Sequence, residues 1–122
     1  MERERFRELV QKAWEELGPE IHALLDNVAI LVEEWPDQGT LEEAGVSSRL
    51  ALLGFYRGTP RTQRGYNYSM APPDTITLYQ RPIERAARRG EPLLELIKQV
   101  LRHEIAHHLG IDDEGLRELG AY

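Results

Sequence analysis

The stretch HEIAHHLGIDDE, residues 103–114, contains the side chains of this sequence that are best suited to chemistry. The chain has no cysteine, so a metal ion would have to be bound by imidazole and carboxylate groups. His103 and His107 are four residues apart. On a helix, residues at this spacing lie on one face with their Cβ atoms about 6 Å apart. Two imidazoles in this arrangement can bind the same metal ion, and we expect that ion to be Zn²⁺.

The acidic residues of the same stretch suggest the remaining parts of a metal site. Glu104 is rotated by about 100° from the first histidine, which places its carboxylate beside the metal, where it can hold a water molecule and act as a general base. Gly110 predicts the end of the helix, because a residue with positive φ turns the chain back sharply. This turn can bring Asp113 to the metal as a third ligand, with Asp112 and Glu118 as alternatives.

The complete pattern H-E-x-x-H-x-x-G-x-x-D is more specific than its first half. Average residue frequencies would produce H-E-x-x-H in roughly one chain of this length in a few hundred, and the extended pattern in roughly one in tens of thousands. Taken singly, the histidines are ordinary surface or core residues, the glycine is a helix cap and the acids form a solvated turn. Their joint spacing favours the metal site.

Three further side chains are candidates for contacts around the metal or with a substrate. His108 follows the second predicted ligand and points off its face, so it either supports the site or is an ordinary surface histidine. Tyr66 and Tyr68 lie in residues 57–74, which are rich in glycine, proline and polar residues and predict a long loop. Either phenol could reach a reacting carbonyl, but no pattern in the sequence positions it.

The elements that must position these groups follow from hydrophobic periodicity. Apolar residues at helical spacing predict helices over residues 2–17, 19–25, 82–89 and 92–109. β-branched and aliphatic runs predict strands over residues 28–32, 50–56 and 75–79, and residues 37–46 are predicted to be a loop with a helical turn at 41–44. The order indicates an α+β fold, with a small mixed β-sheet packed against an N-terminal helix and the C-terminal helix that carries the site.

Two stripes of side chains run along the last predicted helix. One is apolar at Leu96 and Val100 and continues with the imidazole side chains of His103 and His107. The other is apolar throughout and predicts the buried face of the helix, through Leu93, Ile97, Leu101, Ile105 and Leu109.

Length and composition restrict the remaining possibilities. The 122 residues are 41% hydrophobic, which predicts one domain spanning residues 1–122. No apolar run approaches the ~20 residues of a membrane span, and the charged N-terminus lacks an apolar signal region, so we expect a cytoplasmic protein. A net charge of −6 argues against a general nucleic-acid binder. A local basic patch is still possible, because seven arginines lie in the middle of the chain: Arg57, Arg61, Arg64, Arg81, Arg85, Arg88 and Arg89.

HEIAHHLGIDD resembles the zinc signature of the zincin metallopeptidases, in particular the metzincin form whose third ligand is histidine or, in some members, aspartate. The whole chain is similar to a small bacterial family of zincin-like metallopeptidases with a minimal matrix-metalloprotease-like domain. The segments that carry this resemblance are GFYRGTP, PPDTITLYQRPI, HEIAHHLGIDDE and the tail ELGAY. The resemblance implies a zincin-like fold, Zn²⁺ bound by His103, His107 and Asp113, and hydrolysis of a peptide or protein tail with Glu104 as general base. Zincins bind peptides along an edge strand, which predicts that residues 75–79 or 50–56 form an edge.

Two other functions stay open from the sequence. A small bacterial family of ribosomal-RNA maturation endonucleases carries H-x-x-x-H-x-x-G-x-x-H on a helix, although an acid does not usually follow its first histidine as Glu104 does here. A non-enzymatic metal-binding or interaction module is the other alternative. One departure from the metzincins favours this module. Metzincins have a methionine turn C-terminal to the zinc motif, whereas Met1 and Met70 both precede the motif here. The sequence specifies neither the substrate nor the oligomeric state.

Overall fold

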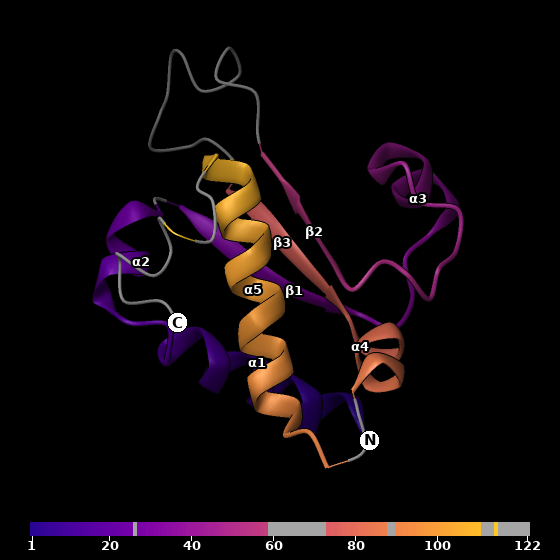
Figure 1. The fold of residues 1–122 in the computed structure, drawn as a ribbon, viewed down its shortest axis with the longest axis horizontal. Coiled ribbons are helices and arrows are strands. Elements are labelled where there is room, and N and C mark those ends of the chain that lie inside the picture. The colour runs from indigo at the N-terminus through magenta and orange to yellow at the C-terminus, as the bar shows by residue number, and fades with distance from the viewer. Residues whose placement is uncertain (26, 59–72, 88–89, 111–113, 115–122) are drawn as a thin grey trace.

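The computed structural model describes residues 1–25, 27–58, 73–87, 90–110 and 114 of the 122-residue chain. Five helices and three strands are defined in these residues, in the arrangement of Figure 1. They confirm the predicted α+β fold with a mixed sheet. In chain order the elements are α1 (Arg3–Glu15), α2 (Pro19–Leu24), β1 (Val28–Glu33), α3 (Gln38–Ala44), β2 (Gly54–Arg57), β3 (Asp74–Tyr79), α4 (Gln80–Ala86) and α5 (Leu93–Leu109).

The sheet has the strand order β1-β3-β2. β1 runs parallel to β3, with Val28 opposite Asp74, and β2 runs antiparallel to β3, with Gly54 opposite Leu78. Within the described part of the chain, β2 is therefore an edge strand and β3 is central. The prediction that residues 75–79 form an edge strand is wrong, because β3 is paired on both sides.

One face of the sheet forms the main core with α1 and α5, and α5 crosses in front of the strands in Figure 1. Side chains alternate between the faces of a strand, so Ile76 and Leu78 of β3 both point to this side. The fully buried residues of the core come from all three elements and include Phe6, Ile76, Leu78, Ile97, Leu101 and Ile105. The apolar stripe of α5 is thus buried as predicted from Ile97 to Ile105, and Leu93 is partly buried. Leu109, the last helical residue, is 37% exposed, so the prediction that it is buried is wrong.

Residues 37–46 contain a full helix, α3, where the sequence predicted a loop with one helical turn. The side chain of Asp37 caps the helix by accepting a 2.7 Å hydrogen bond from the backbone N–H of Thr40. Gly45 ends the helix in the left-handed conformation, with φ of 72°. α3 lies beside the sheet in Figure 1 and contributes to a second, smaller core of Leu41, Leu52 and Tyr79.

β2 is shorter than the predicted strand over residues 50–56. The backbone N–H of Ala51 donates to the carbonyl of Ser48 at 3.0 Å, and the N–H of Leu50 donates to the Ser48 hydroxyl at 3.2 Å. These turn contacts occupy the backbone N–H groups of Leu50 and Ala51, so the first part of the predicted segment is not a strand, and β2 begins at Gly54.

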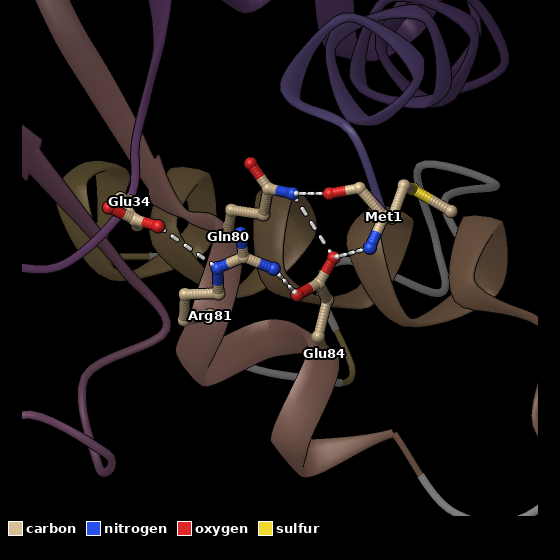
Figure 2. A network of polar contacts seen from close by, with 5 residues as sticks. All are labelled: Met1, Glu34, Gln80, Arg81 and Glu84. Carbon is tan, nitrogen blue, oxygen red and sulfur yellow. Dashed lines mark hydrogen bonds and ion pairs between the residues drawn. The ribbon is translucent and has the colours of Figure 1, made fainter.

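A polar network connects the start of the chain to α4 (Figure 2). Gln80 is buried, and its Nε2 donates to the carbonyl of Met1 at 2.8 Å and to Oε2 of Glu84 at 3.1 Å. Arg81 bridges Glu84 and Glu34, with distances of 2.9 Å and 3.1 Å. The network fixes the end that precedes α1 against the helix that follows β3.

Among the described residues, no helix is long and apolar enough to cross a membrane.

Candidate functional site

α5 presents His103 and His107 at the point where one of its stripes leaves the core. Leu96 and Val100, earlier on that stripe, are buried, whereas both histidines are exposed. The helix continues to Leu109, so the four-residue spacing does place the two imidazoles one turn apart on one helix face. Neither histidine is used to fill the core, which leaves both available as metal ligands.

The side chain of Glu104 extends from α5 toward the edge strand β2 and is half-buried. Its Oε1 accepts a 3.2 Å hydrogen bond from the backbone N–H of Tyr56 on β2. Burial raises the pKa of the Glu104 carboxyl above its ordinary value, although the Tyr56 N–H and the neighbouring imidazoles of His103 and His107 act in the opposite direction. A carboxylate with a raised pKa, fixed by one hydrogen bond, is suited to proton transfer nearer neutral pH.

The alternation of backbone hydrogen bonds explains why Tyr56 can reach Glu104. The N–H of Tyr79 on β3 donates to the carbonyl of Leu53 at 3.0 Å. In an antiparallel pair the residues alternate between facing the partner strand and facing away from it. The backbone groups of Leu53 and of every second residue after it therefore face β3. Those of Gly54 and Tyr56 face the open edge.

Gly54 allows β2 to approach α5 closely. A Cβ atom at this position would lie 3.0 Å from Cγ1 of Val100 and 3.3 Å from the carbonyl oxygen of Thr77. Any larger residue would push the strand away from the helix. The missing side chain thus sets the separation at which the N–H of Tyr56 meets Glu104.

Two clefts meet at the candidate site. One, of about 510 Å³, is lined by residues 51–54 and by α5 from Leu96 to Glu104. The other, of about 360 Å³, lies toward α3 and is lined by Val46, Tyr56 and His107 among others. Both clefts are lined by Leu52, Gly54, His103 and Glu104. His103, His107 and Glu104 are thus open to solvent and to a ligand lying along the edge of β2.

Several predicted site residues lie outside the described residues: Asp113, the alternatives Asp112 and Glu118, and Tyr66 and Tyr68. Within the part that is described, no three histidine, aspartate or glutamate side chains converge as a metal site. Gly110, at the end of α5, is described, and its φ of 70° is positive as predicted. Two exposed imidazoles on one helix face, with a carboxylate beside them, fit the donor set of a zinc site that needs one further protein ligand.

His108 has specific partners that sequence reasoning missed. Its ring stacks on that of Tyr56, with centroids 3.7 Å apart and the ring planes 11° from parallel. The Tyr56 hydroxyl donates to Oδ2 of Asp74 at 3.1 Å, and Nε2 of His108 lies 3.9 Å from the same oxygen. Nothing in local periodicity could have shown this cluster, because its members are 18 to 52 positions apart in the sequence.

Comparisons with known proteins agree with this geometry. The sequence model of the zincin-like metallopeptidase family matches residues 25–121. A solved structure of a conserved hypothetical protein from Thermus thermophilus is similar in fold, with a TM-score of 0.57 and 26% sequence identity over 88% of this chain and 92% of that chain. No protein with a curated description matches the sequence. Because the family match spans most of the sequence, including both histidines and Glu104, this chain belongs to the zincin-like metallopeptidase family.

Proposed function

We propose that this chain is a zinc-dependent peptidase in which His103 and His107 bind Zn²⁺, with Asp113 as the third protein ligand and Glu104 as the general base. Family membership supports a metallopeptidase-type function. The observation that carries the proposal is the position of Glu104. Its carboxylate is held at the edge of the sheet by the N–H of Tyr56, one residue from the first proposed ligand and within a cleft.

A zinc ion held by these ligands supplies Lewis acidity, which makes water a nucleophile near neutral pH and polarises a carbonyl group. Glu104 accepts the proton of the attacking water and passes it to the nitrogen of the leaving amine. Oε1 of Glu104 is engaged by the N–H of Tyr56, so we assign the proton transfer to Oε2. The hydrogen bond also limits rotation of the carboxylate, which keeps Oε2 directed toward the substrate.

The edge of β2 supports a peptide as the substrate. Gly54 turns its backbone groups to this edge, and its carbonyl group can pair with an extended chain. The clefts on both sides of Glu104 provide room for side chains of such a peptide. An extended peptide or a protein tail therefore fits the site better than a globular surface does.

The arginines give little support to the endonuclease alternative. Arg57 is paired with Glu43 at 3.1 Å, and Arg81 is paired with Glu34 and Glu84. These carboxylates neutralise two members of the arginine cluster, and the whole chain carries a net charge of −6. Binding to a phosphate backbone requires a basic surface, so the charge distribution favours a peptide substrate.

Zinc content and hydrolysis of a peptide library, measured on the same preparations, test the proposal. We expect close to one zinc per chain in the wild type and loss of zinc in His107→Ala and Asp113→Ala. Glu104→Gln should retain zinc and lose roughly 10²- to 10⁴-fold in kcat, because it lacks the base. Glu95→Gln, the same change at an exposed position of α5, is the matched control and should behave like the wild type.

Each negative result has a distinct meaning. Zinc bound by the wild type without any peptide hydrolysis would favour the non-enzymatic metal-binding module. Absence of zinc after reconstitution would overturn the metal site itself. Equal activity in Glu104→Gln and the wild type would overturn the role of Glu104.

A further inference from the structure

Tyr56 contacts the candidate site through three separate groups. Its backbone N–H donates to Oε1 of Glu104 at 3.2 Å, and its hydroxyl donates to Oδ2 of Asp74 at 3.1 Å. Its ring stacks on His108 with a centroid distance of 3.7 Å. Glu104 and His108 both belong to α5, Asp74 begins β3, and Tyr56 itself belongs to β2. One residue of the edge strand therefore connects the helix that carries the site with the central strand.

The stacking contact holds the last turn of α5. His108 lies against the ring of Tyr56 on one side, and a Cβ at Gly58 would be only 3.4 Å from its Cε1, so the backbone of the chain after β2 also lies close to it. His108 directly follows His107 in the helix. Fixing the ring of His108 therefore fixes the backbone that carries the proposed second ligand.

Asp74 anchors the phenol of Tyr56. The residue is buried, and its backbone N–H donates to the carbonyl of Asn27 at 3.0 Å, which places it firmly at the start of β3. A buried carboxylate is costly unless it accepts hydrogen bonds, and the hydroxyl of Tyr56 supplies one. The interaction is thus favourable for both partners and fixes the orientation of the ring that stacks on His108.

We propose that Tyr56 is a positioning residue of the metal site: its N–H orients the carboxylate of Glu104, and its ring, anchored by Asp74, fixes the turn of α5 that carries His107. This inference rests on the proposed roles of Glu104 and His107. The N–H and the hydroxyl of Tyr56 are directed at Glu104 and Asp74, so we assign Tyr56 a positioning role and not a catalytic one.

Substitutions of the side chain test the stacking contact. Tyr56→Leu removes the ring and the hydroxyl, whereas Tyr56→Phe keeps the ring. We expect Tyr56→Leu to bind zinc roughly tenfold more weakly and to lose roughly tenfold in kcat with little change in KM, which is typical of losing a group that supports a metal ligand. Tyr56→Phe should recover only part of both losses, because it keeps the ring but loses the anchor at Asp74. Zinc affinity is measured by competition with a chromophoric chelator, and folding by circular dichroism.

Tyr79 provides a matched control. It lies on the neighbouring strand β3, packs with Leu41 and Leu52 away from α5, and its hydroxyl hydrogen-bonds with the side chain of Thr40. Tyr79→Leu and Tyr79→Phe make the same chemical changes in the same sheet. We expect them to lower stability without altering zinc affinity or kcat.

Replacing the peptide N–H of Tyr56 by an ester oxygen, through the corresponding α-hydroxy acid, tests the hydrogen bond to Glu104. This change leaves the side chain intact, so we expect kcat to fall roughly tenfold at unchanged zinc affinity. The same ester at Tyr79 removes a hydrogen bond to the carbonyl of Leu53 and serves as the control. It should lower stability and leave kcat unchanged.

The zinc measurements keep the inference separate from the proposed function. If the wild type binds zinc but cleaves no peptide, the proposed function fails, and the zinc affinity of Tyr56→Leu still decides the role of the ring. Wild-type zinc affinity and kcat in a folded Tyr56→Leu would overturn the inference while leaving the function intact. If Tyr56→Leu does not fold, Asp74→Ala, which removes the acceptor of the Tyr56 hydroxyl, and the ester at Tyr56 decide. Wild-type zinc affinity in Asp74→Ala and wild-type kcat in the ester would overturn the inference. A wild type without zinc would overturn both.

Discussion

The backbone of Gly54 on β2 passes so close to Val100 on α5 that a Cβ atom at position 54 would lie 3.0 Å from Cγ1 of the valine. This contact sets the separation between the edge strand and the helix. Two residues further along β2, the N–H of Tyr56 reaches Oε1 of Glu104 at 3.2 Å. The position of the proposed general base therefore depends on the absence of a side chain at position 54.

Gly54→Ala should destabilise the fold by about 1–3 kcal/mol, the usual cost of inserting a methyl group into a packed core. Urea unfolding measures this free energy. Val100→Ala removes the contacting methyl groups, so the double variant should be more stable than the sum of the two single effects predicts. Strict additivity would show that the contact does not matter. At Gly39 in α3, a Cβ would be 3.7 Å from its nearest neighbour, so Gly39→Ala should stabilise by about 0.5–1 kcal/mol.

Gly110→Ala should destabilise the protein by about 1–2 kcal/mol, because an L-residue is strained at a φ of 70°. It should also weaken zinc binding, since Gly110 lies between His107 and Asp113 in the sequence. Gly45 ends α3 with φ of 72° and ψ of 28°, almost the same conformation, and a Cβ would meet nothing within 4 Å at either glycine. Gly45→Ala should therefore cost the same stability without affecting zinc. Equal zinc affinity in both variants would contradict the role of the turn at Gly110.

Glu84 should make stability depend on pH in the acidic range. Burial raises the pKa of its carboxyl, but hydrogen bonds from Gln80 and Arg81 and the charge of the Met1 amine outweigh burial and leave the pKa below the ordinary value of 4.5. A lowered pKa in the folded state contributes stability that is present above about pH 4.5 and is lost as the pH falls through the folded-state value.

Glu84→Gln should consequently be less stable than the wild type at pH 7, and the difference should shrink as the pH falls below 4.5. Urea unfolding at a series of pH values measures the difference. Glu8→Gln, on the exposed side of α1, is the control for removing one negative charge. A difference between Glu84→Gln and the wild type that stays constant with pH would show that the network of Figure 2 does not depend on the charge of Glu84.

Removal of zinc should lower the melting temperature if the metal binds only the folded chain. Free zinc at 100 times its dissociation constant would stabilise the fold by about 2.7 kcal/mol. Differential scanning calorimetry with zinc and with a chelator measures the shift. His107→Ala should show no shift, whereas Glu104→Gln should show the full shift, because Glu104 is proposed as a base and not as a ligand. Identical shifts in His107→Ala and the wild type would place the metal elsewhere.

Local sequence signals predicted the elements that depend on periodicity. α1 and α5 occupy close to their predicted segments because their apolar residues recur at helical spacing, and β1 and β3 do so because they are rich in β-branched and aliphatic residues. α3 was predicted only as a turn, although Asp37 and Gly45 are capping residues at the right separation for a short helix. β2 was predicted too long, because an apolar run does not show that backbone contacts to Ser48 occupy its first residues.

Some features of the candidate site depend only on neighbours along the chain and could be predicted. The spacing of His103 and His107 fixes their common helix face, and Gly110 fixes the turn at the end of the helix, because helix geometry and backbone sterics act over a few residues. The contact of Tyr56 with Glu104, 48 residues away, and its contacts with Asp74 and His108 could not be predicted in this way. Those contacts depend on strand order, register and the close approach at Gly54, which arise when distant segments bury their apolar faces together.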